Sequence, residues 1–388
     1  MISFLSNPAI LCAAGASAEE FFNSLLEKNQ SGIKRVKCAE RDFFAGVVSS
    51  PLESVDDKAD SRFLRLLSAC LSKIAPTVEK AKSRYGVERV GLCLGQCDNG
   101  SERSLFSHES FFKNGEFLPS YSLFEQSAQY AADFAAKKLG ISSLALSFST
   151  ACASSASAIS FARSLILSGK CDAVVAGGVD IASKTTLLGF SALEAVSPNI
   201  TNPMSANRSG ITLGEGAAFF VLSKDDLDET NIALLGAGES SDAFHITSPR
   251  EDGAGAALAM NRALLDAKLS PQKIDYVNLH ATGTRLNDAM EARAMAFVFG
   301  ENSVPASGTK PLTGHTLGAA GAIELAAGFL SVSRGYLFPH TWDCVQDKTI
   351  PSVNLVQNAK EAKIDYAMSN SFAFGGCNVS LILGKAEV

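Results

Sequence analysis

Residues 144–169 read LALSFSTACASSASAISFARSLILSG. Leu144 to Ser149 forms a short apolar run, which predicts a buried strand. A helix is expected from Cys152 to Ser168, because small and apolar residues dominate this stretch and Gly169 closes it. A strand that passes directly into a small-residue helix is typical of an α/β protein, and this unit organises the interpretation of the whole chain.

The same alternation continues in both directions. In the first half we expect a helix at 122–138 and strands at 87–94 and 173–176, the latter ended by Gly177 and Gly178. The second half predicts strands at 232–235, 274–279 and 379–383 and helices at 256–268, 287–298 and 318–333. This rhythm favours an α/β fold with a largely parallel sheet.

The chain divides into two halves at its most polar connector, Ser223–Asn231. We therefore expect one unit at residues 1–226 and a second at residues 227–388. The segments that begin at Ala151 and at His315 both open small-residue helices and can be aligned with each other. Such helices are common, so the alignment does not establish a duplication, but it fits two similar halves packed together.

Composition excludes several classes of protein. The 388 residues are 46% hydrophobic and only 19% charged, with a net charge of -6, which excludes a disordered chain and argues against nucleic acid as the main partner. No apolar run is long enough to span a membrane. Residues 9–14 are apolar but lack the preceding Lys or Arg of a secretory signal. Nine cysteines without a Cys-x-x-Cys motif favour a reduced, cytoplasmic protein without a zinc site.

Cys152 is the candidate nucleophile. A cysteine in the first turn of a helix faces unpaired backbone N–H groups and the positive end of the helix dipole. Both favour the thiolate, which is the reactive form. The neighbouring Ala and Ser residues would let a substrate approach closely. A buried structural cysteine is the alternative that this segment alone leaves open.

Two histidines and a lysine lie near predicted element ends. His280 follows a predicted strand, where the sites of α/β proteins gather. His315 lies after a Gly-rich loop and before a helix. Lys310 has only small neighbours in that loop, so we expect a buried ion pair, with Glu324 as its partner. A satisfied core or surface residue is the alternative for either histidine, and sequence order does not show that the fold joins them to Cys152.

A glycine loop precedes the last predicted strand. Phe374 is followed by Gly375 and Gly376, and adjacent glycines allow backbone N–H groups to converge on an anion. This loop is a candidate oxyanion hole, with Phe374 placed to cover a pocket. A plain tight turn with a core phenylalanine is the alternative. We interpret a second glycine-rich segment, 207–216, as a structural turn with an Arg208–Glu215 pair.

Together these segments resemble the β-ketoacyl-ACP synthases of the elongating, Cys-His-His type within the thiolase superfamily. The resemblance rests on Thr150-Ala-Cys152, His280, Thr309-Lys310, Gly314-His315 and Phe374-Gly-Gly, which occur in family order. It covers the chain from about residue 85 onward, and the N-terminal stretch looks shortened. It implies the thiolase fold, in which two similar halves form a five-layered α/β/α/β/α core. It also implies a homodimer, or a heterodimer with a homologous synthase or chain-length factor.

The resemblance implies a ping-pong reaction in fatty-acid or polyketide biosynthesis. Cys152 would accept an acyl chain as a thioester, malonyl-ACP would lose carbon dioxide, and the enolate would attack the thioester. By the family pattern, His280 and His315 donate hydrogen bonds to the malonyl thioester oxygen. Lys310, oriented by Glu324, would hold His315 and balance the charge of the site. No metal or organic cofactor is implied, because the phosphopantetheine arm belongs to the acyl carrier protein.

By the same family pattern, the glycine loop acts in the transfer and binding of the acyl chain. The backbone N–H groups of Cys152 and Phe374 would form the oxyanion hole, and Phe374 would be the gate of the acyl pocket. The adjacent Gly375 and Gly376 complete the family's motif.

The chain departs from the family pattern at three places. Ala281 and Ala373 stand where the family usually has glycine, and Asn202–Ser205 replaces a stretch that is commonly Arg-Pro-aromatic-Asp. The two alanines are expected to stiffen loops that move in the family. These changes leave room for a specialised role, such as secondary polyketide or aryl-polyene assembly.

Three related classes of protein are alternatives to this interpretation. A thiolase places a second cysteine before a C-terminal glycine run, whereas Cys377 follows the glycines. The initiating synthases use Cys-His-Asn, which His315 disfavours. A non-catalytic chain-length factor generally lacks the nucleophile, so Cys152 favours the active subunit.

An acyl carrier protein is acidic, so its docking surface should be basic. Lys58, Arg62 and Arg65 are predicted to open a helix whose end carries further basic residues, and this helix is the candidate dock. A solvated helix face is the alternative.

Overall fold

The computed structural model describes residues 2–386. Its helices are α1 (Ala18–Glu27), α2 (Arg62–Tyr85), α3 (Ser101–Asn114), α4 (Ala128–Leu139), α5 (Ser154–Leu167), α6 (Lys184–Ala192), α7 (Ala254–Ala267), α8 (Arg285–Phe299), α9 (Lys310–Thr313) and α10 (Ala320–Arg334). The strands of its main sheet are β1 (Phe4–Leu5), β2 (Ala9–Cys12), β5 (Val90–Gly95), β6 (Ala145–Phe148), β7 (Ala173–Asp180), β9 (Gly216–Ser223), β10 (Ile232–Ser241), β11 (Tyr276–Asn278), β12 (Ala306–Ser307), β15 (Tyr366–Phe372) and β16 (Cys377–Lys385). Smaller sheets contain β3 (Ile33–Cys38), β4 (Arg41–Gly46) and β8 (Leu213–Gly214), and β13 (Tyr336–Leu337) with β14 (Lys360–Glu361).

The main sheet has the order β12-β11-β15-β16-β10-β1-β9-β7-β5-β6, with β2 paired to β9. The two ends of this order mirror each other, because β5 is parallel to β6 and β7 while β11 is parallel to β12 and β15. The remaining pairs are antiparallel, as in β15–β16 and β7–β9. The prediction of a largely parallel sheet is therefore wrong. The physical reason is that β15 turns back into β16 through a short loop rather than through a crossover helix.

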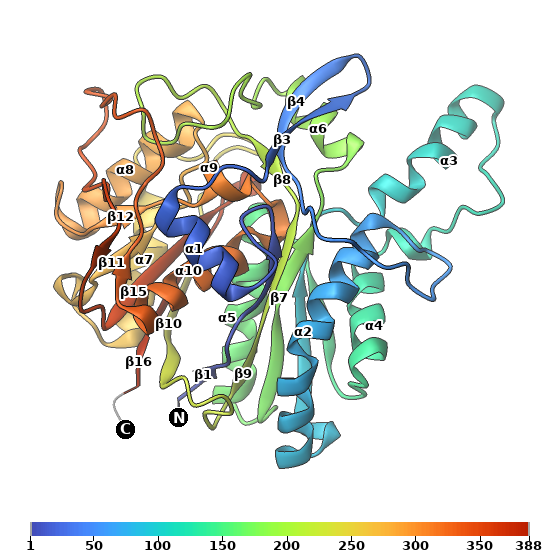
Figure 1. Cartoon of the computed structure of the whole chain (residues 1–388), viewed down its shortest axis with the longest axis horizontal. Coiled ribbons are helices and arrows are strands. Elements are labelled where there is room, and N and C mark those ends of the chain that lie inside the picture. The colour runs from blue at the N-terminus through green and yellow to red at the C-terminus, as the bar shows by residue number, and fades with distance from the viewer. Residues whose placement is uncertain (1, 387–388) are drawn as a thin grey trace.

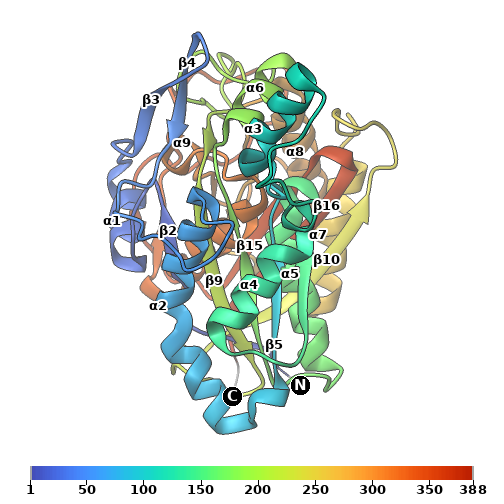
Figure 2. The same cartoon turned by 90° about the vertical axis from the view of Figure 1, so that its right-hand side faces the viewer.

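The contacts between helices and strands show how the elements are stacked in layers (Figure 1). Helices α5 and α10 contact each other and lie in the middle, with α5 against β5 and β7 and α10 against β15 and β9. Helices α2 and α4 cover the outer face of the first half, and α7 and α8 cover that of the second half (Figure 2). This is the five-layered α/β/α/β/α arrangement of the thiolase fold, with a separate apolar core in each outer layer and one around α5 and α10.

A strand–turn–helix unit occurs in both halves. Ala151 begins a 3-10 turn with φ of +49° before α5, and Leu317 begins a 3-10 turn with φ of +47° before α10. Cys152 thus corresponds to Gly318, two positions from the alignment that the sequence suggested. Runs of small residues give an alignment no distinctive point of reference, which explains the error.

The predicted elements are all present, but several ends differ. Helix α4 begins at Ala128, where Ser127 accepts a hydrogen bond from the Gln129 N–H at 3.2 Å, rather than near residue 122. Strand β7 continues through Gly177 and Gly178 instead of ending there. A Cβ at Gly178 would lie 2.7 Å from the Gly95 carbonyl oxygen, so these glycines allow close packing rather than a turn.

No helix within residues 2–386 is both long and apolar enough to cross a membrane.

Candidate active site

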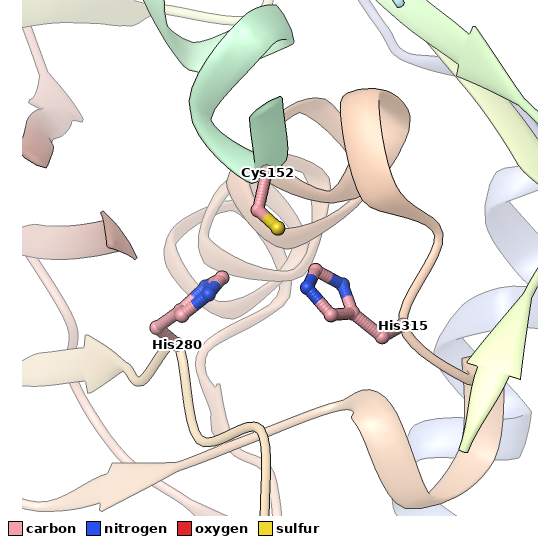
Figure 3. A group of neighbouring side chains, drawn as sticks. All are labelled: Cys152, His280 and His315. Atoms are coloured by element: carbon pink, nitrogen blue, oxygen red, sulfur yellow. The ribbon is translucent and has the colours of Figure 1, made fainter. Parts of the chain in front are cut away.

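Cys152, His280 and His315 meet although they are far apart in the sequence (Figure 3). Cys152 lies in the 3-10 turn between β6 and α5, His280 follows β11, and His315 follows α9. One ring nitrogen of each histidine and the Cys152 Sγ all lie within 4.8 Å of one another, and all three side chains are buried. The cysteine sulfur points between the two imidazole rings (Figure 3).

The backbone at Cys152 is held by local hydrogen bonds. Ala151 has left-handed φ, which costs an L-residue about 1–2 kcal/mol and is typical of a strained functional turn. The Ser154 hydroxyl accepts a hydrogen bond from the Thr150 N–H at 2.9 Å and donates one to the Ala151 carbonyl at 2.6 Å. These bonds fix the turn that directs the Cys152 side chain into the site.

Lys310 is the buried cation of the site. Its ammonium donates to Glu324 and to the backbone carbonyl of His280, and its Nζ is 3.3 Å from the His280 Nδ1. An ammonium is only a donor, so Nδ1 accepts and the ring proton of neutral His280 resides on Nε2. That Nε2 is buried and has no hydrogen-bond partner among the described residues. His280 therefore holds a free N–H donor.

Both imidazoles are neutral. Burial lowers the pKa of His280 well below its ordinary value, and the positive charge of Lys310 lowers it further. The pKa of His315 is also lowered well below its ordinary value, by burial first and then by Lys310 and His280. The Nδ1 of His315 is likewise buried without a partner in the described chain. Two neutral rings beside a buried ammonium suit an anion that forms during a reaction.

Cys152 is a thiol in the resting site. Burial raises its pKa to about 12, although Lys310 and a hydrogen bond from the backbone N–H of Phe374 oppose the rise. The expectation that the helix end favours a thiolate is therefore wrong for the resting protein. Two features explain this outcome: α5 begins at Ser154, beyond the cysteine, and the desolvation of a buried charge outweighs the dipole.

The glycine loop brings backbone donors to the sulfur. Phe374 places its N–H against Cys152, and its ring lies 5.8 Å from that of Phe190. Gly375 and Gly376 have φ of +82° and +78°, which explains why both are glycine. The loop closes one side of a cavity of about 390 Å³ that reaches Cys152, His280 and His315.

Two buried carboxyl groups near the site had no motif to reveal them. Glu291 accepts the backbone N–H groups of His280 at 2.8 Å and Ala281 at 2.7 Å. The Asp180 carboxyl accepts a hydrogen bond from the backbone N–H of Gly318 at 2.8 Å. Burial raises the pKa of Asp180 to about 7. Glu291 lies one helix turn after Asn287 and Asp288, which are also buried, so no pattern of apolar residues in α8 distinguished it.

The candidate dock looks different in the structure. Lys58 lies before α2, which begins at Arg62, so it does not open the helix as predicted. The Nε of Arg62 donates to Glu215 at 2.6 Å, and the Nε of Arg65 donates to Asp60 at 2.8 Å. These two guanidinium groups are therefore engaged within the chain.

The Arg208–Glu215 pair that the sequence suggested is wrong. Arg208 instead pairs with Asp347 at 2.5 Å, and Glu215 belongs to Arg62. Both pairings bridge segments distant in sequence, which proximity along the chain could not predict.

Cys152, His280 and His315 are also the one group in residues 2–386 whose ligand atoms are close enough to hold a metal ion. The ammonium of Lys310 beside His280 disfavours a cation there. The absence of a metal stays a prediction.

Comparisons with known proteins identify the family of this chain. A family model described as "Beta-ketoacyl synthase, N-terminal domain" matches residues 9–227, and one described as "Beta-ketoacyl synthase, C-terminal domain" matches residues 232–342. The mitochondrial 3-oxoacyl-[acyl-carrier-protein] synthase of Arabidopsis thaliana is 36% identical over 332 residues, which are 80% of this chain and 70% of the relative. The 3-oxoacyl-[acyl-carrier-protein] synthase 2 of Vibrio cholerae is 31% identical over 97% of each chain.

The solved structures that this chain resembles are also ketosynthases. The structure of the ketosynthase ApeO in complex with its chain length factor ApeC, from Xenorhabdus doucetiae, contains a chain that is 37% identical, with a TM-score of 0.92 and coverage of 99% of this chain and 98% of that one. The ishigamide ketosynthase/chain length factor structure contains one that is 26% identical, with a TM-score of 0.88 and 99% of each chain covered. The chain belongs to the β-ketoacyl synthase family of the thiolase superfamily. It is an acyltransferase of that family.

Proposed function

We propose that this chain is the catalytic subunit of a β-ketoacyl-ACP synthase in fatty-acid or polyketide biosynthesis. The observation that carries the proposal is the meeting of the Cys152 thiol with two neutral histidines, within 4.8 Å, in a buried cavity. The first unit, residues 1–226, supplies the nucleophile, and the second, residues 227–388, supplies both histidines, Lys310 and Glu324.

In the first half-reaction, the Cys152 sulfur attacks the thioester carbonyl of an acyl-ACP. The thiol proton leaves with the carrier's sulfur, so that free ACP thiol and an acyl-Cys152 thioester are formed. The backbone N–H groups of Cys152 and Phe374 stabilise the oxyanion that develops on the carbonyl. The Phe374 N–H already lies at the sulfur, which supports this assignment. Phe374 is proposed as the gate of the acyl pocket, with Gly375 and Gly376 shaping the loop.

In the second half-reaction, malonyl-ACP loses carbon dioxide and becomes an enolate. The Nε2–H of His280 and a ring N–H of His315 donate to the enolate oxygen. Lys310, held by Glu324, keeps the two rings neutral and balances the negative charge. The enolate carbon attacks the acyl thioester, and the released Cys152 sulfur takes up one proton from water.

Two partners follow from this chemistry. The acyl and malonyl groups arrive on the phosphopantetheine arm of an acyl carrier protein, so the reaction needs no further cofactor. The second partner is a subunit of the same fold, either another copy or a chain-length factor, as in the complex of ApeO with ApeC. We place the protein in the cytoplasm. Both ApeO–ApeC and the ishigamide structure pair a ketosynthase with a chain length factor, which favours the heterodimer over the homodimer.

The test is intact-protein mass spectrometry after incubation with a panel of acyl-ACPs, with malonyl-ACP added afterwards. The wild-type protein should gain an acyl adduct that malonyl-ACP discharges as β-ketoacyl-ACP. Cys152→Ala should gain none, whereas Cys344→Ala, which changes an exposed cysteine, should behave as wild type. An adduct that persists in Cys152→Ala would refute the nucleophile.

A further inference from the structure

The cavity that reaches Cys152 has a buried end and an exposed end. Cys152, His280 and His315 are buried at one end, while Arg285 and Leu286 are exposed and also line the cavity. A substrate carried on a pantetheine arm must place its thioester at Cys152 and therefore pass its remaining length toward the exposed end.

Arg285 is unusual among the arginines of this chain. Each of the other arginines in residues 2–386 donates a side-chain hydrogen bond or forms an ion pair, including Arg208 and Arg293. The Arg285 guanidinium has neither within this range. Its backbone is nonetheless fixed, because Thr284 caps the start of α8 and the Arg285 carbonyl accepts a hydrogen bond from Arg208 at 3.3 Å. A fixed backbone therefore presents a free cation at the cavity.

The other charged side chains that line the cavity do not neutralise the charge of Arg285. Asp242 is buried and satisfied, since it accepts the Asn378 amide at 2.7 Å and the Arg250 N–H at 3.0 Å. Glu194 is exposed, and no ion pair joins it to Arg285. The positive charge is thus available to a ligand.

We propose that Arg285 binds the phosphodiester of the carrier's phosphopantetheine arm and so favours thioesters that carry this phosphate over thioesters of pantetheine alone. The arm has a thioester at one end and a phosphodiester at the other. With the thioester at Cys152, the phosphodiester lies toward the exposed end, where the planar guanidinium can bind two phosphate oxygens. The inference rests on the proposed function, and it adds a binding residue that no motif of this sequence revealed.

The test measures binding rather than turnover. In the Cys152→Ala protein, dissociation constants are compared for acetyl-pantetheine and for its 4′-phosphate methyl ester, which carries the single negative charge of the natural arm. The methyl ester should bind about tenfold more tightly, as expected for one charge-assisted contact at a partly exposed site. Adding Arg285→Ala should remove this preference, Arg285→Lys should keep part of it, and Arg293→Ala on the same helix should keep all of it.

Acetyl-ACP and acetyl-CoA are then compared on the same proteins, because the pantetheine of each is esterified at its 4′ position, to a phosphodiester in ACP and to a diphosphate in CoA. Weaker binding of acetyl-ACP in Arg285→Ala supports the proposal, and a loss confined to acetyl-CoA overturns it. The proposal is also overturned if Arg285→Ala leaves the phosphate preference unchanged, or if the Cys152→Ala protein with Arg285 intact shows no such preference. If the preference depends on Arg285 but the wild-type protein shows no condensing activity, the phosphate site is sustained and the proposed function is refuted.

Discussion

At the scale of single residues, the site is a set of groups whose charged forms are suppressed by burial. Cys152 keeps its proton and both histidines stay neutral, while Lys310 is neutralised by its neighbour Glu324. Such a site holds little charge at rest and gains charge only when a thioester reacts. The fixed N–H donors then act where water cannot compete.

His315→Ala should separate the two half-reactions. Acylation needs the thiol and the backbone donors, so an acyl adduct on Cys152 should still form. Decarboxylation should fall by about 100-fold or more, because one donor to the enolate is missing. Carbon dioxide release from malonyl-ACP checks the second step, and intact mass checks the first. A variant that condenses at the wild-type rate would remove His315 from the mechanism.

Glu291 should make stability depend on pH. Burial raises its pKa to about 8, above that of the unfolded chain, so its contribution is complete at low pH and declines as pH rises toward 8. Glu291→Gln should remove this dependence. Between about pH 5 and 8 the wild type should lose more stability than the variant, by at most about 1.4 kcal/mol per pH unit.

Urea unfolding at several pH values measures this difference. Glu301→Gln changes an exposed carboxyl and should track the wild type. Parallel curves for the wild type and Glu291→Gln would show that the Glu291 carboxyl is ionised at neutral pH.

At the scale of elements, the turn that holds Cys152 depends on how closely β7, α5 and the Leu317–Ala319 turn approach one another. A Cβ at Gly178 would lie 2.8 Å from both the Gly318 carbonyl oxygen and the Ser155 Cβ. Asp180, at the end of the same strand, bonds the N–H of Gly318. The two halves are thus in direct contact next to the turn that holds Cys152.

Gly178→Ala should push these elements apart. We expect a loss of about 1–3 kcal/mol in the free energy of unfolding, as for other overpacked cores, together with slower acylation of Cys152. Gly189→Ala is the matched control, because a Cβ there would have no atom of the described chain within 4 Å. Chemical denaturation and acylation kinetics measure both effects. Equal behaviour of the two variants would disprove the close-packing role of Gly178.

At the scale of the whole molecule, large apolar side chains are exposed on α3 and the segment that follows it. Phe106, Phe112, Leu123 and Phe124 are 67%, 84%, 73% and 63% exposed. Helix α3 projects from the body of the molecule (Figure 1). Strand β6, at one end of the main sheet, also has no neighbouring strand on its outer side within residues 2–386. An apolar surface with an open sheet edge is suited to a second subunit of the same fold.

Phe112→Asp should weaken this association. The substitution places a charge on the most exposed of these aromatic side chains, so the dimer, or the complex with a co-expressed chain-length factor, should dissociate at about tenfold higher concentration. Light scattering after size exclusion measures it. Leu265→Asp on α7 alters a side chain of similar exposure, 79%, and should not affect assembly. Unchanged assembly in Phe112→Asp would place the interface elsewhere.

Local pattern was enough for much of this protein. Strand and helix alternation predicted the α/β class, and the motifs around Cys152, His280, Lys310 and His315 predicted the family, which the comparisons confirm. The ion-pair partner Glu324 also followed, because Lys310 had only small neighbours to bury it. These features depend on residues near one another in sequence, or on motifs that occur in a fixed order.

Only the tertiary structure decided the rest. The antiparallel strands, the correspondence of Cys152 with Gly318, and the partners of Arg62 and Arg208 all depend on contacts between distant segments. The protonation of Cys152 depends on burial, which a helix-end argument does not contain. The sequence by itself determined which chemical groups are present, and the fold determined their charge and their neighbours, because desolvation and pairing exist only once the halves have packed together.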